Sequence, residues 1–184
     1  RKCSAGEGVD VTDLRYRTDT ARRRFEATVE RRHGERVVLD ATYFYPTGGG
    51  QPHDTGRLEA GGETWRVTDV TKRDTVYHHL DGPEPPSPGT TVTGHISWGR
   101  REAHMRYHTA QHLLSAVLLS AFDAETTGNQ LYADRARIDC AHPRFETSDL
   151  ERVEARVNDL VARDLPVRWY EVDRERAERE LDPE

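Results

Sequence analysis

The chain has 184 residues, which is long enough to bury a hydrophobic core in one domain or in two small ones. Its formal net charge is −6, so overall charge does not favour a nucleic-acid-binding protein, although arginines can still gather locally on one surface. No segment approaches the roughly 18 consecutive apolar residues of a membrane span, so no membrane partner is predicted.

The two ends of the chain and its cysteines give little sign of secretion. The N-terminal residues lack the apolar stretch of a signal peptide. Cys3 lies in a terminal tail, so a disulfide with Cys140 is not expected. A reducing, cytoplasmic setting fits this cysteine usage.

The first half of the chain predicts short β-strands joined by turns. Residues 24–30 alternate in polarity, with Phe25, Ala27 and Val29 on one face. Further strands are expected over residues 35–41, 57–60, 63–70, 75–80 and 90–98. About six or seven short strands at this close spacing favour a small antiparallel β-barrel.

A glycine-rich loop, TGGGQPHDTG, occupies residues 47–56. Gly48, Gly49 and Gly50 carry no Cβ, so the backbone before Gln51 can come close to a ligand. The alternative is a barrel corner whose backbone needs positive φ angles, and the two interpretations are compatible.

From residue 99 the pattern becomes mixed. The expected order is a helix over 101–122, a turn over 127–132, a strand over 136–140, a helix that begins near Ser148 and ends at Pro166, and a strand over 167–172. Ser148 and Glu151 are spaced as a capping box for the second helix. The sequence therefore predicts an α+β protein in which the small barrel precedes a mixed domain.

His108 and His112 are four residues apart on the first predicted helix, so they share one face and can chelate one Zn²⁺. The plainer alternative is two surface histidines. Thr109 stands where a zinc protease needs glutamate, which disfavours that class. Cys140 and His142 could complete a site, although a cysteine in an alternating strand is more often a core residue.

Three motifs in this order give the chain a family resemblance. YFYPTGGGQPHDTG (43–56), RYHTAQHLLSAV (106–117) and TGNQLYADRARID (127–139) resemble the alanyl-tRNA editing proteins of the AlaX family and the editing domain of alanyl-tRNA synthetase. The resemblance covers about residues 14–180. It implies an unassigned tail over 1–13, a β-barrel domain over 14–98 and an editing domain over 99–184 that is incomplete at its C-terminal end.

The resemblance also implies a zinc-dependent hydrolase that deacylates tRNA(Ala) mischarged with serine, and with glycine as a further substrate. His108 and His112 are its implied zinc ligands. The other two ligands, a Cys and a His, belong to a later segment that this chain lacks, so we expect a C-terminal truncation. A non-catalytic, RNA-binding fragment is the alternative.

The same resemblance implies that the glycine-rich loop influences the amino-acid pocket, and we hypothesise further roles for polar and basic residues from their positions. Residues expected to line the amino-acid pocket are Thr127, Asn129, Gln130 and Gln111, and the loop expected to reach that pocket comprises Gly48, Gly49, Gly50 and Gln51. Ordinary turn chemistry is the alternative for the residues around Gly128. Arg100, Arg101 and Arg106 are expected to meet phosphates of the tRNA(Ala) acceptor end, against the alternative of a solvated helix face.

Overall fold

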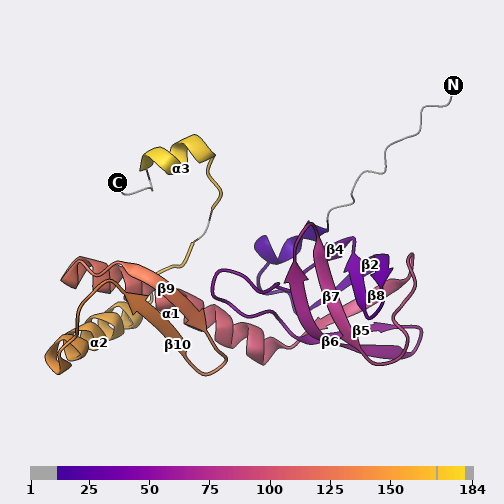
Figure 1. Ribbon diagram of the computed structural model, residues 1–184, viewed down its shortest axis with the longest axis horizontal. Helices are drawn as coiled ribbons and strands as arrows, with labels where there is room; N and C mark the ends of the chain where they lie inside the picture. The colour runs from indigo at the N-terminus through magenta and orange to yellow at the C-terminus, as the bar shows by residue number, and fades with distance from the viewer. Residues whose placement is uncertain (1–11, 169, 181–184) are drawn as a thin grey trace. The chain divides into compact units, whose positions relative to one another are not determined.

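The computed structural model describes residues 12–168 and 170–180 (Figure 1). The chain divides into two compact units, Arg1–His142 and Pro143–Glu184. Residues 1–11 of the predicted N-terminal tail lie outside the described residues. Within the described ranges, no helix combines the length and the apolar character needed to cross a membrane.

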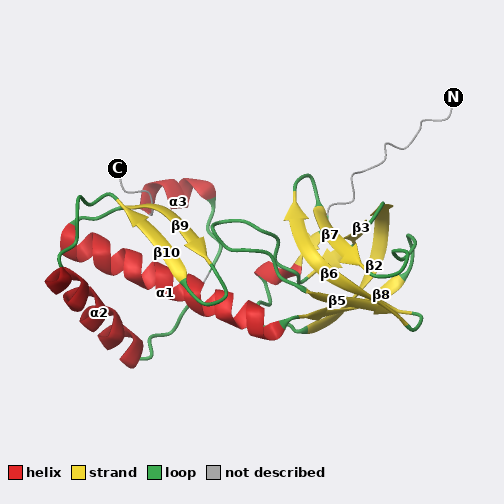
Figure 2. Cartoon of the chain, turned by 60° about the horizontal axis from the view of Figure 1, so that its bottom comes forward, coloured by secondary structure: helices red, strands yellow, loops and turns green. Residues whose placement is uncertain are grey.

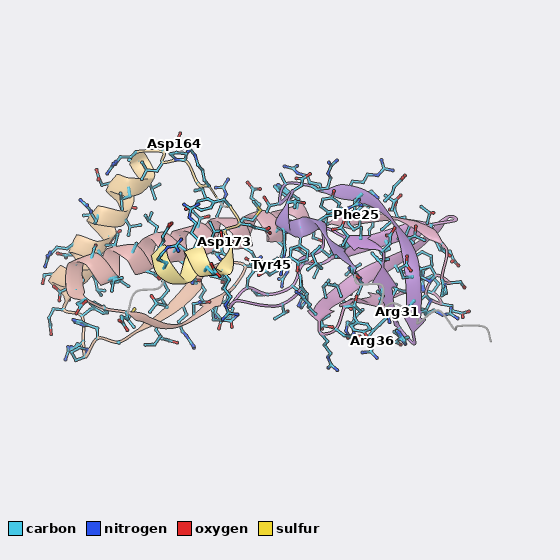
Figure 3. All side chains as sticks on the ribbon, turned by 90° about the horizontal axis from the view of Figure 1, so that it is seen from above. Phe25, Arg31, Arg36, Tyr45, Asp164 and Asp173 are labelled. Carbon is cyan, nitrogen blue, oxygen red and sulfur yellow. The ribbon has the colours of Figure 1, made fainter. Side chains whose placement is uncertain are left out.

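Six antiparallel strands of the first unit close into a barrel in the order β2-β3-β7-β6-β5-β8. Their bounds are β2 (Arg24–His33), β3 (Arg36–Leu39), β5 (Gly56–Ala60), β6 (Glu63–Lys72), β7 (Val76–Asp81) and β8 (Thr91–Ile96). Phe25, Ala27 and Val29 of β2 are buried in the barrel core, as their alternation predicted (Figure 3 labels Phe25). The predicted small barrel is confirmed.

Short elements lie beside the barrel. β1 (Asp13–Leu14) runs parallel to β4 (Ala41–Thr42), and a 3-10 helix η1 (Arg15–Arg17) follows β1. The barrel interior is apolar, with Trp65 and Phe44 among its largest fully buried side chains. The imidazole of His78 is also fully buried. Its Nε2 lies 2.8 Å from Thr42 Oγ1, and its Nδ1 lies 3.3 Å from the Val37 carbonyl oxygen.

Helix α1 (Trp98–Phe122) follows β8 almost directly. It begins three residues before the predicted helix and contains both His108 and His112. The helix stops at Asp123, whose φ of 52° takes the backbone into the left-handed region. The domain boundary that we predicted between residues 98 and 99 falls one residue inside α1, and it stays a prediction.

Strands β9 (Thr126–Leu131) and β10 (Ala136–Cys140) form an antiparallel hairpin beside α1 (Figure 2). The predicted strand over 136–140 is confirmed, whereas the predicted turn over 127–132 is wrong. Pairing with β10 keeps Gly128 and Asn129 extended, and the turn comes later, where the Tyr132 amide donates to the Arg135 carbonyl oxygen at 2.8 Å. Local turn preference is overridden by strand pairing.

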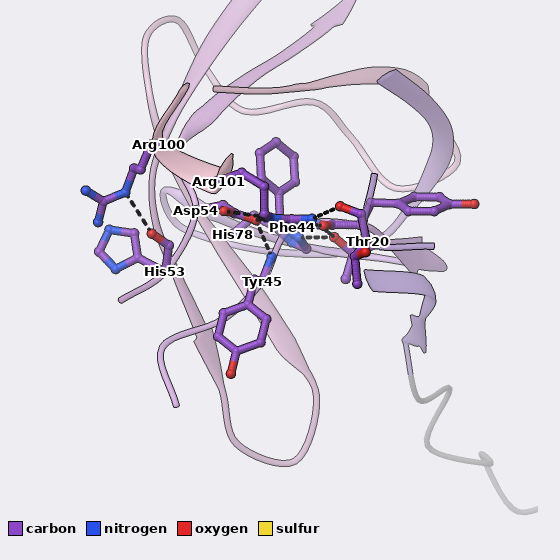
Figure 4. A network of polar contacts seen from close by, with 10 residues as sticks. Thr20, Phe44, Tyr45, His53, Asp54, His78, Arg100 and Arg101 are labelled. Atoms are coloured by element: carbon purple, nitrogen blue, oxygen red, sulfur yellow. Dashed lines mark hydrogen bonds and ion pairs between the residues drawn. The ribbon is translucent and has the colours of Figure 1, made fainter. Parts of the chain in front are cut away.

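A buried ion pair between Arg101 of α1 and Asp54 of the glycine-rich loop fastens the helix to the barrel (Figure 4). The side chains of Arg101 and Asp54 are 3% and 0% exposed. Arg101 Nε lies 3.0 and 2.9 Å from the two carboxylate oxygens, and its other nitrogens donate to the carbonyls of Thr20 and Tyr43. The Tyr45 amide donates to Asp54 at 2.7 Å. Both buried charges are therefore compensated.

The second unit contains α2 (Thr147–Ala162) and α3 (Arg174–Glu180). The predicted capping box is wrong by two residues: Glu146 and Asp149 form it, and the Glu146 amide donates to Asp149 Oδ2 at 3.1 Å. Glu146 has an extended backbone, so the helix begins at Thr147 and Ser148 is already helical.

The strand predicted over 167–172 is also wrong. Residues 167–168 and 170–172, which are the described part of that range, form no strand, and no neighbouring strand of this unit pairs with them. An unpaired alternating segment gains no ladder hydrogen bonds. Asp173 ends the segment and accepts a 2.8 Å hydrogen bond from the Arg176 amide at the start of α3 (Figure 3).

Replacing Arg101 tests the buried ion pair. Arg101→Leu leaves the Asp54 carboxylate buried without its cation, so we expect the free energy of unfolding to fall by about 3–5 kcal/mol. The matched control is Arg106→Leu on the same helix, where Arg106 is exposed and pairs with Glu102 at i,i+4, and its loss should stay below about 0.5 kcal/mol. Urea unfolding measures both, and equal losses would contradict the assigned role.

His78 gives the barrel a pH dependence of defined sign. Burial lowers its pKa from the ordinary 6.5 to about 4, so between these values the unfolded chain binds a proton that the folded chain does not. The His78 contribution to stability is complete above about pH 6.5 and is lost as the pH falls toward 4, by up to about 3 kcal/mol. When urea unfolding is measured at several pH values in this range, the free energy of unfolding should change less steeply with pH in His78→Gln than in the wild type. His33→Gln is the control, because His33 is exposed. A pH dependence of stability in His78→Gln equal to that of the wild type would show that His78 is not its cause.

Candidate functional site

The two helical histidines meet at their outer ring nitrogens. His108 Nε2 and His112 Nε2 are 3.1 Å apart, and the rings are stacked with centroids 5.0 Å apart. Two zinc ligands at about 2.0–2.1 Å in a tetrahedral arrangement have their donor atoms about 3.3 Å apart, so the pair fits the bite of one metal ion. Burial, and after it the neighbouring His112, lower the pKa of His108, which favours the neutral ring that a metal requires.

The glycine-rich loop turns sharply in front of this helix. Gly48 and Gln51 exchange two backbone hydrogen bonds of 3.0 Å each, and Gly49 and Gly50 between them have φ angles of 59° and 76°. Two positive φ angles at the central positions are typical of a type I′ turn. The expectation of positive φ in this loop is met.

Gly50 is where the loop contacts β9. Its carbonyl oxygen accepts hydrogen bonds from the Leu131 amide at 2.8 Å and from Gln130 Nε2 at 3.2 Å. A Cβ built on Gly50 would lie 1.6 Å from Asn129 Oδ1. Only a residue without a side chain permits this approach, so the loop and the hairpin are in direct backbone contact.

Gln51 connects the same loop to the histidine pair. Its side-chain oxygen lies 2.8 Å from His108 Nδ1, and the residue is 5% exposed. An imidazole that binds a metal through one nitrogen commonly donates its other N–H to an oxygen acceptor. Gln51 therefore occupies the place that such an outer partner would take if His108 bound a metal.

The predicted pocket residues have different surroundings. Gln111 is buried on α1, and its side-chain oxygen has no hydrogen-bond partner within the described residues. The Asn129 side-chain oxygen is also buried without a described partner. Gln130 donates to Gly50 and to its neighbouring carbonyl, so its amide holds the loop, whereas Thr127 is exposed. Their part in substrate binding stays a prediction.

The three predicted phosphate-binding arginines also differ. Arg101 is buried in its ion pair with Asp54, so its guanidinium fastens the helix and is not presented to solvent. Arg100 is partly buried and donates to the His53 carbonyl oxygen at 3.0 Å (Figure 4). Arg106 is exposed and pairs with Glu102. The structure thus leaves Arg100 and Arg106 as the surface arginines for the predicted phosphate contacts.

A complete metal-binding set is not found in the part of the chain that the structure describes, which contains no group of three or more His, Cys, Asp and Glu side chains around a common point. Cys140 is a free, partly buried thiol in β10, and burial raises its pKa. Burial therefore favours the thiol form of Cys140 over the thiolate that a metal needs. The assignment of His108 and His112 as zinc ligands stays a prediction.

Two residues near the site were not singled out from the sequence. Asp54 ends the segment GQPHD and determines where α1 attaches. His104 lies one helical turn before His108, is completely buried, and has no hydrogen-bond partner for either ring nitrogen among the described residues. The spacing of four residues through His104, His108 and His112 was a signal that could have drawn attention to it.

Comparison with known proteins places the chain in a family. A sequence model for class II (A) tRNA synthetases matches residues 14–100. The alanyl-tRNA editing protein AlaX-M of Methanosarcina barkeri is 40% identical over 178 residues, which cover 93% of this chain and 73% of that protein. The chain belongs to the AlaX-M family of alanyl-tRNA editing proteins.

Longer relatives contain the same region as a part. The alanine–tRNA ligase of Thermococcus kodakarensis is 39% identical over 175 residues, which cover 92% of this chain but 19% of the ligase. AlaX-L of Pyrococcus horikoshii is 39% identical over 141 residues, or 34% of its length. The match to AlaX-M leaves out only a small share of this chain, so it takes in the glycine-rich loop, the histidine pair and the β9 hairpin together.

Substitution of single glycines tests the contact between the loop and β9. Gly50→Ala forces a Cβ onto Asn129 at a positive φ, a backbone conformation that costs a non-glycine residue about 1–2 kcal/mol before any clash. Gly48→Ala is the matched control, because its Cβ would meet only the Pro46 oxygen at 4.0 Å.

The readout is hydrogen exchange at the Leu131 amide, which donates to Gly50. Protection should fall about tenfold or more in Gly50→Ala and stay at the wild-type level in Gly48→Ala. Equal protection in the two variants would show that the loop does not depend on close approach at Gly50.

Proposed function

We propose that this chain carries the editing site of an aminoacyl-tRNA deacylase. The enzyme hydrolyses the ester bond that links serine, or glycine as a second substrate, to mischarged tRNA(Ala). The supporting observation is the 3.1 Å approach of His108 Nε2 and His112 Nε2, next to a loop and a hairpin that supply polar groups, in a member of the AlaX-M family. The relatives are named as alanyl-tRNA editing proteins and alanine–tRNA ligases.

The reaction is needed because the binding of alanine alone cannot exclude serine well enough. A pocket that admits alanine rejects serine, which adds one hydroxyl, by only about a hundredfold. A second site that recognises the hydroxyl and hydrolyses the ester supplies the remaining discrimination. Such a site needs hydrogen-bonding groups for a small polar side chain, a group that activates the ester or the water, and contacts for the end of the tRNA.

Polar groups of this chain fit the first requirement. The side-chain oxygens of Gln111 and Asn129 are buried acceptors without partners in the described structure, and leaving such atoms unpaired costs about 1–3 kcal/mol each. A seryl ester brings a hydroxyl and an ammonium group, both donors, that can satisfy them. Thr127 and Gln130 extend this polar lining along β9, in our proposal, while the backbone of Gly48–Gln51 closes it on the barrel side.

The histidine pair fits the second requirement. His108 and His112 are the residues that would hold zinc, which when bound supplies a Lewis acid for the ester carbonyl or for a water. Burial lowers the pKa of His108, which favours its neutral ring, and Gln51 contacts Nδ1, so Nε2 is the nitrogen that faces His112. Arg100 and Arg106 are the proposed contacts for phosphates of the acceptor end.

A second candidate function follows from the small number of ligands. Because the described residues contain no group of three or more potential metal ligands, the chain fits a non-catalytic tRNA-binding protein as well. This alternative uses the same arginines and the same loop, but it predicts binding of tRNA(Ala) without hydrolysis.

Deacylation of Ser-tRNA(Ala) by the protein expressed from its complete gene tests the proposal. We expect hydrolysis, about one zinc per chain by elemental analysis, and the loss of both in His108→Ala and His112→Ala. The rate should fall by more than the roughly 10–100-fold that removal of an outer partner causes. Thr109→Ala is the matched control, since Thr109 lies between the histidines but is exposed, and its hydroxyl donates to the Met105 carbonyl oxygen within the same helix.

Two outcomes contradict the zinc-dependent deacylase. Wild-type zinc content and rate in His108→Ala exclude a metal role for the pair. Tight binding of tRNA(Ala) with no hydrolysis by the wild-type protein favours the non-catalytic alternative.

A further inference from the structure

In the hydrogen bond between Gln51 and His108, the donor and the acceptor can be told apart. The acceptor is the side-chain oxygen of Gln51, 2.8 Å from His108 Nδ1. A carbonyl oxygen carries no proton, so this hydrogen bond exists only if Nδ1 of His108 carries one. In a neutral imidazole the other nitrogen is then bare, and here that nitrogen is Nε2, which faces His112.

The position of Gln51 is fixed independently of the histidine. Its backbone is held by the two hydrogen bonds with Gly48, and Gly50 next to it is held by the Leu131 amide and packed on Asn129. The residue is 5% exposed, so water has little access to its side chain. The acceptor is therefore set in place by the barrel loop before any ligand arrives.

We propose that Gln51 is a positioning residue, which fixes His108 as the Nδ1–H tautomer and so keeps Nε2 free to bind the metal. This inference deepens the proposed function and rests on it for the identity of the metal. The protonation pattern itself does not depend on catalysis. It also assigns the barrel a part in the chemistry of α1, because Gln51 and His108 are 57 residues apart in the sequence.

Nuclear magnetic resonance of the complete ¹⁵N-labelled chain, freed of metal and held near pH 7.5, tests the tautomer directly. Long-range ¹H–¹⁵N spectra distinguish a protonated ring nitrogen from a bare one, and the His108 signals are those missing from His108→Gln. We expect a protonated Nδ1 and a bare Nε2. A protonated Nε2 in the wild-type chain overturns the proposal, and this measurement needs no variant at position 51.

Variants separate the acceptor from simple packing. Gln51→Leu keeps a similar volume but removes the acceptor, so His108 should lose the fixed Nδ1 proton. Gln51→Glu restores an acceptor oxygen and should retain it. Gln111→Leu is the matched control, a glutamine of similar burial on α1 whose oxygen has no described partner, and it should leave the His108 tautomer unchanged.

Zinc titration supplies the second readout and separates the two proposals. Zinc affinity should fall about 10–100-fold in Gln51→Leu and recover in Gln51→Glu. A His108 that keeps its Nδ1 proton in Gln51→Leu overturns the positioning role. If the protein expressed from its complete gene shows the expected tautomer but binds no zinc, the role of Gln51 is supported and the zinc-dependent deacylase is contradicted.

Discussion

The arrangement of the candidate site depends on the buried ion pair between Arg101 and Asp54. Asp54 closes the glycine-rich loop, and Arg101 lies in the first turn of α1, two turns before His108. A buried charge without its partner is costly, so the loop and the helix hold each other in one relative position. The loop can then present Gln51 and Gly50 to the helix and hairpin at hydrogen-bond distance.

Because the ion pair attaches α1 to the loop of the barrel, the barrel contributes to the site. Its strands supply the rigid core that carries the loop, and the loop supplies the acceptor for His108 and the carbonyl that binds the Leu131 amide. The histidines come from α1 and the remaining polar groups from β9. Three segments far apart in the sequence thus contribute to one cluster, and AlaX-M relatives match this chain over all three.

The sequence predictions succeeded for the inward face of β2 and failed for two segments whose conformation depends on strand pairing. Alternation of Phe25, Ala27 and Val29 identified an inward strand face, because side-chain direction in a strand is a local property. The turn assigned around Gly128 failed because β10 pairs with that segment, and the strand assigned over 167–172 failed because no strand of its unit pairs with it. Both errors concern strand pairing, which depends on a second segment, whereas the capping box was misplaced by two residues because several polar residues of that short stretch can begin a helix.

By itself the sequence determined the small barrel, the helix that carries His108 and His112 at a shared face, and the family to which the motifs belong. These follow from periodicity, helical spacing and motif order, which can be read from the linear sequence without knowing the tertiary contacts. Only the tertiary structure decided that Arg101 is buried, that Gly50 contacts Asn129, and that Gln51 reaches His108. Such contacts join residues about 50 to 80 positions apart, and their existence depends on how packed segments meet in space.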